Sequence, residues 1–334
     1  MITAGIDVGF GFTKAVGNGR QRIFRSAIGA FSPIAFQPEG AGSGTSTAIE
    51  FGGRRLFVGD AALRQATPEA TITANRTVTF EGMALLMAAI HLLVPDQLNV
   101  QLRLVVGLPI QQYSKLKESY IAAAMGDHNF KIVSLDGASE YDKKVEIVSV
   151  KVLPQPFGCV FDRLLDGQGR IVNKAMATGQ IGIIDGGYNT LDLLRVENLE
   201  YINRRSTSYS EMGVFEVSKL FSNRIYDRLG VEIPPEKAEQ YIKSGSIKIS
   251  GKMYSLAGIL DECYEIEVTN VISRVKSIWP DYALLDAIIP TGGGIIPIQN
   301  RLKDTFGEIV QTGANLIWDN ANGFEKYGKL AWPS

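Results

Sequence analysis

Short apolar or alternating stretches recur along this chain and are separated by turns or by longer helical segments. They predict β-strands over residues 23–36, 48–58, 101–106, 144–153, 180–185, 190–196 and 287–290. Residues 2–16 predict a strand, a Gly-rich turn and a returning strand. Residues 37–47, rich in Gly, Ser and Thr, predict a loop, and His128, after Gly126 and Asp127, predicts a turn.

Helices are predicted where Ala, Leu and Met dominate or where apolar positions recur on one side. These segments are residues 80–94, 113–124, the latter part of 209–229, the first part of 234–249 before a small hairpin, and 255–279. Strands and helices therefore alternate, as in an α/β fold.

One short unit occurs twice in the sequence. Residues 5–14 are Gly-Ile-Asp-Val-Gly-Phe-Gly-Phe-Thr-Lys, and residues 182–190 are Gly-Ile-Ile-Asp-Gly-Gly-Tyr-Asn-Thr. The two aspartates, Asp7 and Asp185, lie 178 positions apart in a chain of 334 residues. This spacing is expected of two duplicated α/β halves, and the length also fits two domains of about 100–200 residues each.

The repeated unit has the chemistry of a phosphate site. Each Asp ends a strand, and the glycines that follow let backbone N–H groups approach a ligand closely. Two such turns could hold a polyphosphate from both sides, while Asp7 and Asp185 hold Mg²⁺ through its waters. A tight hairpin without a ligand explains either turn alone, but the pair favours binding.

A third glycine motif, Pro290-Thr-Gly-Gly-Gly294, follows the strand predicted near the end of the chain. Consecutive glycines allow a flat ring or a phosphate to pack against the backbone. No Gly-x-x-x-x-Gly-Lys-Ser/Thr occurs, which excludes a P-loop, and Gly9-x-Gly11 lacks the third glycine of a dinucleotide fingerprint.

Composition narrows the function further. Lys plus Arg (34) and Asp plus Glu (35) nearly balance, so we expect no direct nucleic-acid binding. Two cysteines, Cys159 and Cys263, stand among apolar neighbours and predict buried thiols in a reducing cytoplasm. The apolar run over residues 82–94 is shorter than the roughly 20 residues that span a bilayer, and we expect no membrane contact. His91, within that run, is expected in the core.

At this point the motifs resemble the superfamily of actin, sugar kinases and heat-shock ATPases. Five segments carry the resemblance: the two phosphate loops at residues 5–14 and 182–192, the connecting segments at 150–158 and 320–328, and the adenosine motif at 287–297. Within it, the chain is most similar to plasmid-segregation actins of the ParM (StbA) type. That likeness rests on the Leu-Pro-x-x-x-Tyr pattern at 108–113, the Val-Lys-Val-x-Pro approach to position 155, and the ending Ala-Asn-Gly-Phe-x-x-Tyr-Gly.

The resemblance implies roles for individual residues. Gln155 stands where the superfamily has a Glu or Gln that orients the attacking water, so Gln155, Asp7 and Asp185 form the implied catalytic set. The implied ATP/ADP-binding residues are Gly9, Phe10, Gly11, Phe12, Thr13, Lys14, Gly186, Gly187, Tyr188, Asn189, Thr190, Glu211, Gly213, Gly292, Gly293 and Gly294. Two positions depart from the pattern: Phe10 replaces a hydroxyl residue, and Asp192 stands where actin has a histidine.

The expected fold is actin-like, with two duplicated RNase H-like α/β domains at a nucleotide cleft. We place them at residues 1–178, with an insertion near 31–79, and 179–334, with an insertion near 220–280. The leading hypothesis is a cytoplasmic ATPase, with GTP as a further substrate, that polymerises head to tail and segregates plasmid DNA through a DNA-binding adaptor. A small-molecule kinase of the same superfold and a non-polymerising nucleotide-gated scaffold remain the alternatives.

Overall fold

The computed structural model describes residues 1–36, 46–67 and 78–333 of the chain. They form two compact units, Met1–Lys174 with Trp318–Ser334, and Ala175–Ile317. This division differs from the predicted domains, 1–178 and 179–334, chiefly in the last helix, which packs with the first unit. The two compact units are unit 1 and unit 2, in that order.

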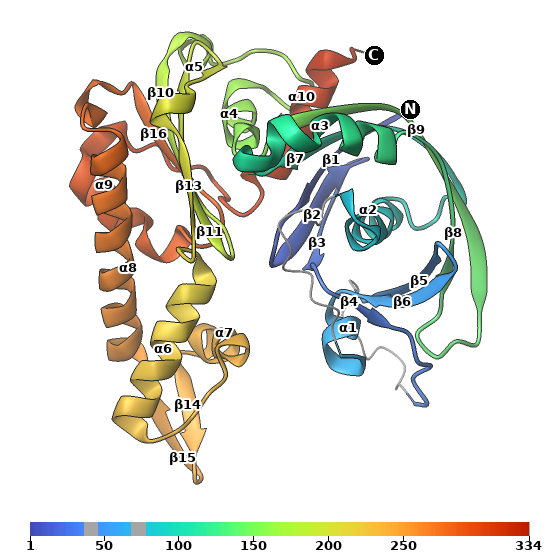
Figure 1. Cartoon of the computed structure of the whole chain (residues 1–334), viewed down its shortest axis with the longest axis horizontal. Coiled ribbons are helices and arrows are strands. Elements are labelled where there is room, and N and C mark those ends of the chain that lie inside the picture. The colour runs from blue at the N-terminus through green and yellow to red at the C-terminus, as the bar shows by residue number, and fades with distance from the viewer. Residues whose placement is uncertain (37–45, 68–77, 334) are drawn as a thin grey trace. The chain divides into compact units, whose positions relative to one another are not determined.

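Unit 1 is built on a mixed nine-stranded sheet with the order β3-β2-β1-β7-β9-β8-β5-β6-β4 (Figure 1). The pairs β1–β7 and β7–β9 are parallel, and the others are antiparallel. The strands are β1 (Ile2–Val8), β2 (Phe12–Gly17), β3 (Arg20–Arg25), β4 (Ile28–Ala30), β5 (Thr47–Phe51), β6 (Arg54–Val58), β7 (Asn99–Leu108), β8 (Gly126–Val133) and β9 (Glu140–Pro154).

Helix α2 (Phe80–Leu93) fills the core of unit 1. Figure 1 shows it inside the curve of the sheet, between β1–β3 and the strands β5, β6 and β8. Nearly all of its side chains are buried, His91 included, which explains why it is apolar all round rather than on one face. Thr79 caps its first turn by accepting a hydrogen bond from the Gly82 amide at 3.3 Å. The predicted helix and the buried His91 are confirmed.

The remaining helices of unit 1 are α1 (Asp60–Gln65), α3 (Ile110–Ala124), α4 (Phe157–Leu164) and α10 (Asp319–Ala331). Helices α4 and α10 cross at a point where only glycine fits. A Cβ on Gly323 would lie 1.7 Å from the carbonyl oxygen of Gly158. This close backbone approach fixes the last helix of the chain onto unit 1, although more than 150 residues separate α10 from α4 in sequence.

Unit 2 contains a five-stranded sheet with the order β12-β11-β10-β16, and β13 also pairs with β11. Its strands are β10 (Gln180–Gly186), β11 (Thr190–Glu197), β12 (Glu200–Tyr201), β13 (Thr207–Ser210) and β16 (Ala287–Thr291); only β10–β16 is parallel. Its helices are α5 (Lys174–Thr178), which crosses the boundary, α6 (Val214–Leu229), α7 (Pro235–Ser244), α8 (Ala257–Ile278) and α9 (Gln299–Phe306).

Two apolar clusters stabilise unit 2. One packs the sheet against α8 and α9 around the fully buried Trp279. The other joins α6, α7, the start of α8 and the hairpin β14 (Ser246–Ile249)–β15 (Lys252–Ser255) around Phe221. The second cluster has its own core and falls mostly within the stretch predicted as an insertion near 220–280.

Most predicted elements are confirmed, but one interpretation was wrong. His128 lies in β8 and not in a turn, because Gly126–Val133 pairs along its whole length with β9. Residues 37–45 of the predicted loop lie outside the described residues. Both cysteines are buried and free, as predicted. Among the described residues, no helix is both long enough and apolar enough to cross a membrane.

Candidate functional site

The two Asp-ended turns have the same internal geometry. Asp7 on β1 is the cross-strand partner of Lys14 on β2, and Asp185 on β10 is the cross-strand partner of Asp192 on β11. In the first turn the Gly9 amide donates to the Phe12 carbonyl at 3.1 Å, and in the second the Gly187 amide donates to the Thr190 carbonyl at 2.9 Å. Each bond joins the second and fifth residues after the aspartate. The repeated sequence unit is therefore a repeated backbone turn.

Asp7 is the centre of the first turn. Its side chain is only 1% exposed, and Lys14 Nζ lies 3.0 Å from its Oδ2. Gln155 Nε2 donates to its other oxygen, Oδ1, at 2.7 Å. The Gln155 backbone amide also donates to the carbonyl of Leu108, the last residue of β7, at 2.8 Å. Asp7 on β1, Lys14 on β2 and Gln155 directly after β9 are thus brought together, and the bond to Leu108 at the end of β7 holds Gln155 in place.

Other side chains of the first turn are used in packing. Thr13 is fully buried, and its hydroxyl lies 2.8 Å from that of Ser26. The Phe12 ring lies under the Arg25 guanidinium, 4.2 Å from centroid to Cζ. The hydroxyl of Thr13, which the resemblance implies as a nucleotide-binding residue, is therefore engaged in the core. Within residues 9–13, the backbone amides other than that of Gly9, which closes the turn, remain the predicted phosphate ligands.

The second turn is held by the triple-glycine motif. The Gly294 amide donates to the Gly186 carbonyl at 2.9 Å. Gly292 has φ +84°, and a Cβ there would lie 2.5 Å from Asp185 Oδ1 and 2.5 Å from the Gly186 carbonyl oxygen. Only glycine combines this left-handed conformation with so close an approach. By contrast, a Cβ on Gly293 would meet nothing within 4 Å.

Residues at the start of α6 also pack on the second turn. The Val214 and Phe215 amides donate to the carbonyls of Gly187 and Tyr188 at 3.2 and 2.9 Å. The Glu211 amide donates to the Asn189 carbonyl at 3.1 Å, with Glu211 in the left-handed region at φ 61°. The predicted site residues Glu211, Gly213, 186–190 and 292–294 are thus neighbours within unit 2.

Asp192 distinguishes the second turn from the first. It is buried, its Oδ2 accepts from the Thr190 hydroxyl at 3.4 Å, and its Oδ1 has no hydrogen-bond partner in the described part of the chain. Burial raises the pKa of Asp192 to about 6, against the opposing hydrogen bonds of Ser208 and Thr190. An unpaired buried carboxylate oxygen is costly, and a perturbed carboxyl group of this kind is a candidate for a functional site.

Sequence reasoning named the members of each group but missed their contacts. The link from Gln155 to Asp7 spans 148 positions and left no local signal. The contrast between Lys14 and Asp192 could have been found from the sequence, because both residues follow their aspartate at the same spacing. The two groups of residues belong to different units.

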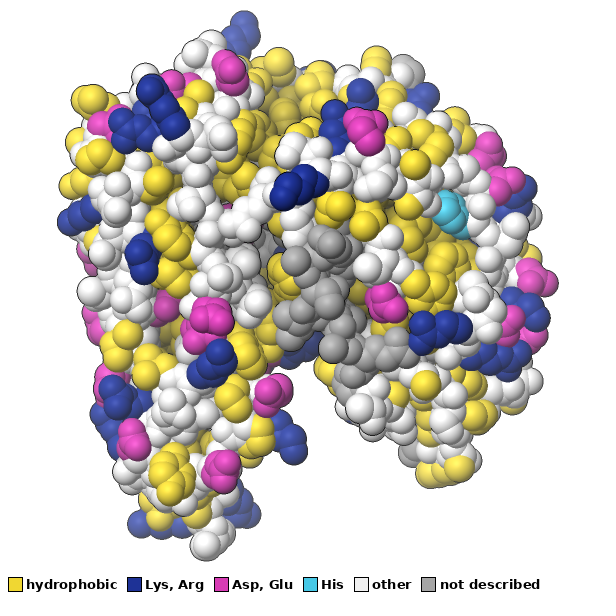
Figure 2. All heavy atoms as spheres, viewed as in Figure 1, with side chains coloured by type: hydrophobic (Ala, Val, Ile, Leu, Met, Phe, Trp, Pro, Cys, Tyr) yellow, Lys and Arg dark blue, Asp and Glu magenta, His cyan; other side chains and the backbone are white. Residues whose placement is uncertain are grey.

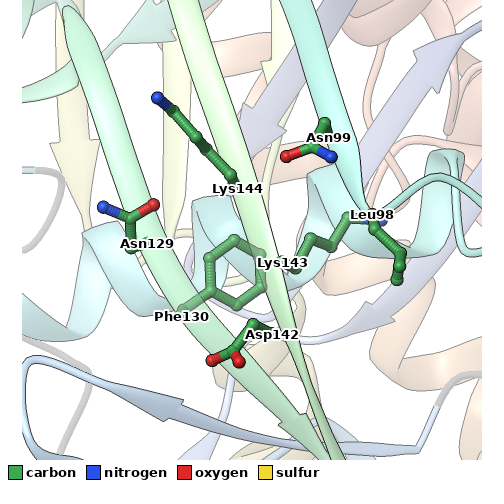
Figure 3. Close-up of a pocket in the computed structure, with 7 residues that line it drawn as sticks. All are labelled: Leu98, Asn99, Asn129, Phe130, Asp142, Lys143 and Lys144. Atoms are coloured by element: carbon green, nitrogen blue, oxygen red, sulfur yellow. The ribbon is translucent and has the colours of Figure 1, made fainter.

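A hollow lies away from the turn in unit 1, where β8, β9 and the start of β7 meet (Figure 3). Its volume is about 380 Å³. Figure 3 shows the Lys143 side chain directed toward Leu98. The Lys143 ammonium donates to the carbonyls of Val94 and Gln97, each at 2.6 Å, and burial lowers its pKa to about 8. Lys143 therefore caps the end of α2.

In each unit taken by itself, the turn offers a carboxylate of the kind that a hydrated magnesium ion uses. In the described residues, no group of three or more His, Cys, Asp or Glu side chains could enclose a metal. Mg²⁺ does not need one, because it keeps several waters and is bound by one or two carboxylates together with phosphates. Gly292 forms a close-fitting cradle against Asp185 Oδ1, where a Cβ would lie 2.5 Å from this oxygen, and so holds one such carboxylate in place.

Comparison with known proteins agrees with this architecture. Residues 5–158 match the family model of the N-terminal domain of actin-like proteins. Residues 183–304 match the C-terminal model of archaeal, MreB-like actin homologues. An archaeal actin homolog from Thermoplasma acidophilum is 23% identical over 326 residues, which cover 92% of this chain and 91% of the relative.

Solved structures show the same fold. A crystal structure of an archaeal actin homolog superposes with a TM-score of 0.82 at 19% identity, over 99% of this chain and 100% of that one. The same homolog in complex with ADP gives a TM-score of 0.77 at 20% identity, over 97% and 98%. A subunit of a 15-stranded ParM filament from Clostridium botulinum gives 0.79 at 22% identity, over 98% and 99%. The predicted actin-like α/β fold is confirmed, and the chain belongs to the actin-like protein family.

Proposed function

We propose that this chain is an ATPase that binds a magnesium nucleotide with its Asp-ended turns and polymerises when it does so. The observation that carries the proposal is the matched pair of turns, with the same Asp spacing and the same glycine-amide hydrogen bond. A hairpin that served only to reverse the chain would need neither a buried Asp at its base nor a copy in the other unit.

The phosphates would be bound mainly by backbone amides within residues 9–13 and 186–190, other than those of Gly9 and Gly187, which close the turns, and Lys14 would assist. Gly292, Gly293 and Gly294 would border the adenine and ribose, with Glu211 and Gly213 at the edge of the nucleoside. The ADP complex of an archaeal actin homolog supports a purine nucleotide as the ligand. ATP is the first choice, and GTP is the competitor to be measured beside it.

Asp7 and Asp185 would hold Mg²⁺ through its waters, and the ion would offset the negative charge of the phosphates. Gln155 would orient the water that attacks the terminal phosphate. An amide is a weak base, but it can accept a hydrogen bond from water and fix its direction, and positioning supplies much of the catalysis in phosphoryl transfer.

Polymerisation is proposed from the filament formed by the ParM relative. A head-to-tail contact between identical subunits that does not close into a ring gives an open filament. We propose plasmid or other DNA as the cargo, attached through an adaptor protein. Figure 2 shows Lys and Arg side chains interspersed with Asp and Glu over the visible face of each unit, and the net charge is −1, which supports an indirect link to DNA.

Sedimentation and phosphate release test the proposal together. The protein is incubated with Mg-ATP, Mg-ADP or no nucleotide, and with Mg-GTP in parallel. We expect pelleting and phosphate release with ATP, and neither with the Asp185→Asn variant. The control is Asp304→Asn, an exposed carboxylate on α9 in the same unit. Hydrolysis by a protein that stays monomeric would favour the non-polymerising scaffold. Turnover only with an added acceptor alcohol would indicate a kinase.

A further inference from the structure

The hydrogen bond between Asp7 and Gln155 determines which end of the Gln155 amide is presented to a ligand. An ionised carboxylate only accepts hydrogen bonds, whereas an amide has a donor end and an acceptor end of nearly the same shape. Because Asp7 Oδ1 lies 2.7 Å from the amide nitrogen, the NH₂ end is held by Asp7. The carbonyl oxygen, Oε1, is therefore the end left for another partner.

Neither residue can easily turn away from this arrangement. The Asp7 side chain is 1% exposed, and its second oxygen is held by Lys14 at 3.0 Å. The Gln155 backbone is tied to Leu108 by its amide at 2.8 Å and to the Gly158 amide by its carbonyl at 3.2 Å. At Gly107, a Cβ would lie 2.9 Å from the Gln155 Cα, so the neighbouring strand already packs closely against it.

We infer that Asp7 is a positioning residue for Gln155, which fixes the amide so that its carbonyl oxygen accepts a proton of the attacking water. This inference rests on the proposed hydrolysis. It gives Asp7 a second role beside its proposed part in holding the hydrated ion. Lys14, by holding the other carboxylate oxygen, keeps Asp7 in the orientation that serves Gln155.

The inference makes an unusual prediction for Gln155→Glu. A carboxylate is a stronger base than an amide, so it would speed the reaction if basicity alone mattered. Here it has no N–H to donate, and it meets Asp7 as a second carboxylate. We expect kcat to fall by about 10- to 100-fold, because misplacing a reacting group by about 1 Å has an effect of that size. The nucleotide Kd should change less than about 3-fold, since no phosphate ligand is removed.

Two further variants make the test specific. Gln101→Glu is the matched control, because Gln101 also donates to a carboxylate, that of Glu146 at 3.1 Å, but on the exposed surface; its kcat should equal that of the wild type. Gln155→Met keeps the length of the side chain without its polar end and should lose turnover as Gln155→Glu does. A kcat for Gln155→Glu at or above that of the wild type would overturn the inference while leaving the ATPase proposal intact.

A second readout needs no turnover. In the nucleotide-free protein, the side-chain amide protons of Gln155 should exchange slowly with solvent in ¹⁵N-resolved NMR spectra, and Asp7→Ala should make them exchange like those of an exposed glutamine. Thermal unfolding confirms that each variant is folded. Rapid exchange in the wild type, or exchange unaffected by Asp7→Ala, would refute the positioning contact. Failure of the wild type to bind any nucleotide would instead refute the proposed function, and the exchange result would still stand.

Discussion

Lys14 and Asp192 occupy equivalent positions in two matching turns, yet they carry opposite charges. Lys14 is the cross-strand partner of Asp7 in unit 1, and Asp192 is the cross-strand partner of Asp185 in unit 2. Each side chain therefore lies on the same face of its sheet as the aspartate it pairs with. In unit 1 the pair is a buried ion pair, whereas in unit 2 it places two carboxylates on adjacent strands. The duplicated turns therefore have different electrostatics.

Lys14→Met should destabilise unit 1. The pair it breaks is largely buried, with side-chain exposures of 15% for Lys14 and 1% for Asp7. Removing one partner leaves a buried charge uncompensated, which we expect to lower the free energy of unfolding by about 2–4 kcal/mol. Urea denaturation followed by circular dichroism measures it.

The control for Lys14→Met is Lys144→Met. The Lys144–Asp127 pair has a similar distance, 2.9 Å, but about half of each side chain is exposed. Such exposed pairs contribute little, so the urea midpoint should not move. Equal effects of the two substitutions would show that the Lys14–Asp7 pair contributes no more to the free energy of unfolding than an exposed ion pair.

Asp192→Asn should stabilise the nucleotide-free protein at neutral pH. Its folded-state pKa is raised by burial to about 6, from an ordinary value of 3.8. The folded state thus binds more protons than the unfolded state between those values, and stability falls as the pH rises through that window. Asn removes this loss, so we expect a gain of about 1–3 kcal/mol at pH 7.5.

At pH 4 the gain from Asp192→Asn should be much smaller, because there the native carboxyl is already protonated in the folded state. Chemical denaturation at the two pH values measures the difference. A gain of the same size at both would mean that the charge of Asp192 is not its cause. If the substitution also weakens nucleotide binding, the carboxylate is retained for function at the expense of stability.

The local motifs were predictable from sequence, because glycines and aspartates impose their turn geometry within a few residues. The two strand–Asp–turn–strand units and the triple-glycine motif, which packs against the second turn, are examples. What sequence could not supply was contact across large separations. The hydrogen bond from Gln155 to Asp7 and the packing of Gly323 on Gly158 both join distant segments. The second of these places the last helix in unit 1, where chain order had suggested the second half.

Strand β8 was missed for a different reason. Its first four residues, Gly126, Asp127, His128 and Asn129, are polar or flexible and typical of turns, and only its second half contributes buried apolar side chains. Pairing with β9 along its length outweighs this weak local propensity. Tertiary pairing decided the structure, as it often does for strands.

His91 should limit stability in acid. Burial, and to a smaller extent the charge of Lys143, lowers its pKa to about 4. The unfolded state then binds more protons between about pH 6.5 and 4, so this group destabilises the fold as the pH falls through that window. His91→Phe should reduce the loss of stability between pH 7 and pH 4 by about 2–3 kcal/mol. Urea midpoints of the wild type and the variant over this range measure it.

Comparing Gly292→Ala with Gly293→Ala tests whether the triple-glycine motif is needed for close backbone packing or only for flexibility. At Gly292 a methyl group would meet Asp185 Oδ1 and the Gly186 carbonyl at 2.5 Å, and the residue has φ +84°. We expect Gly292→Ala to lower the free energy of unfolding by about 1–3 kcal/mol, because it strains the backbone and displaces the second turn. Gly293→Ala has no such contact and should fold with wild-type stability.

Nucleotide binding distinguishes the two glycine variants further. Gly292→Ala should weaken the Kd for fluorescent ATP at least about 10-fold, because it moves the carboxylate proposed to face the hydrated ion. A weaker Kd for Gly293→Ala, with unchanged stability, would place the nucleoside directly against that glycine, since a methyl group there is excluded by the ligand alone. Unchanged binding by Gly292→Ala would show instead that the second turn does not depend on the triple-glycine cradle.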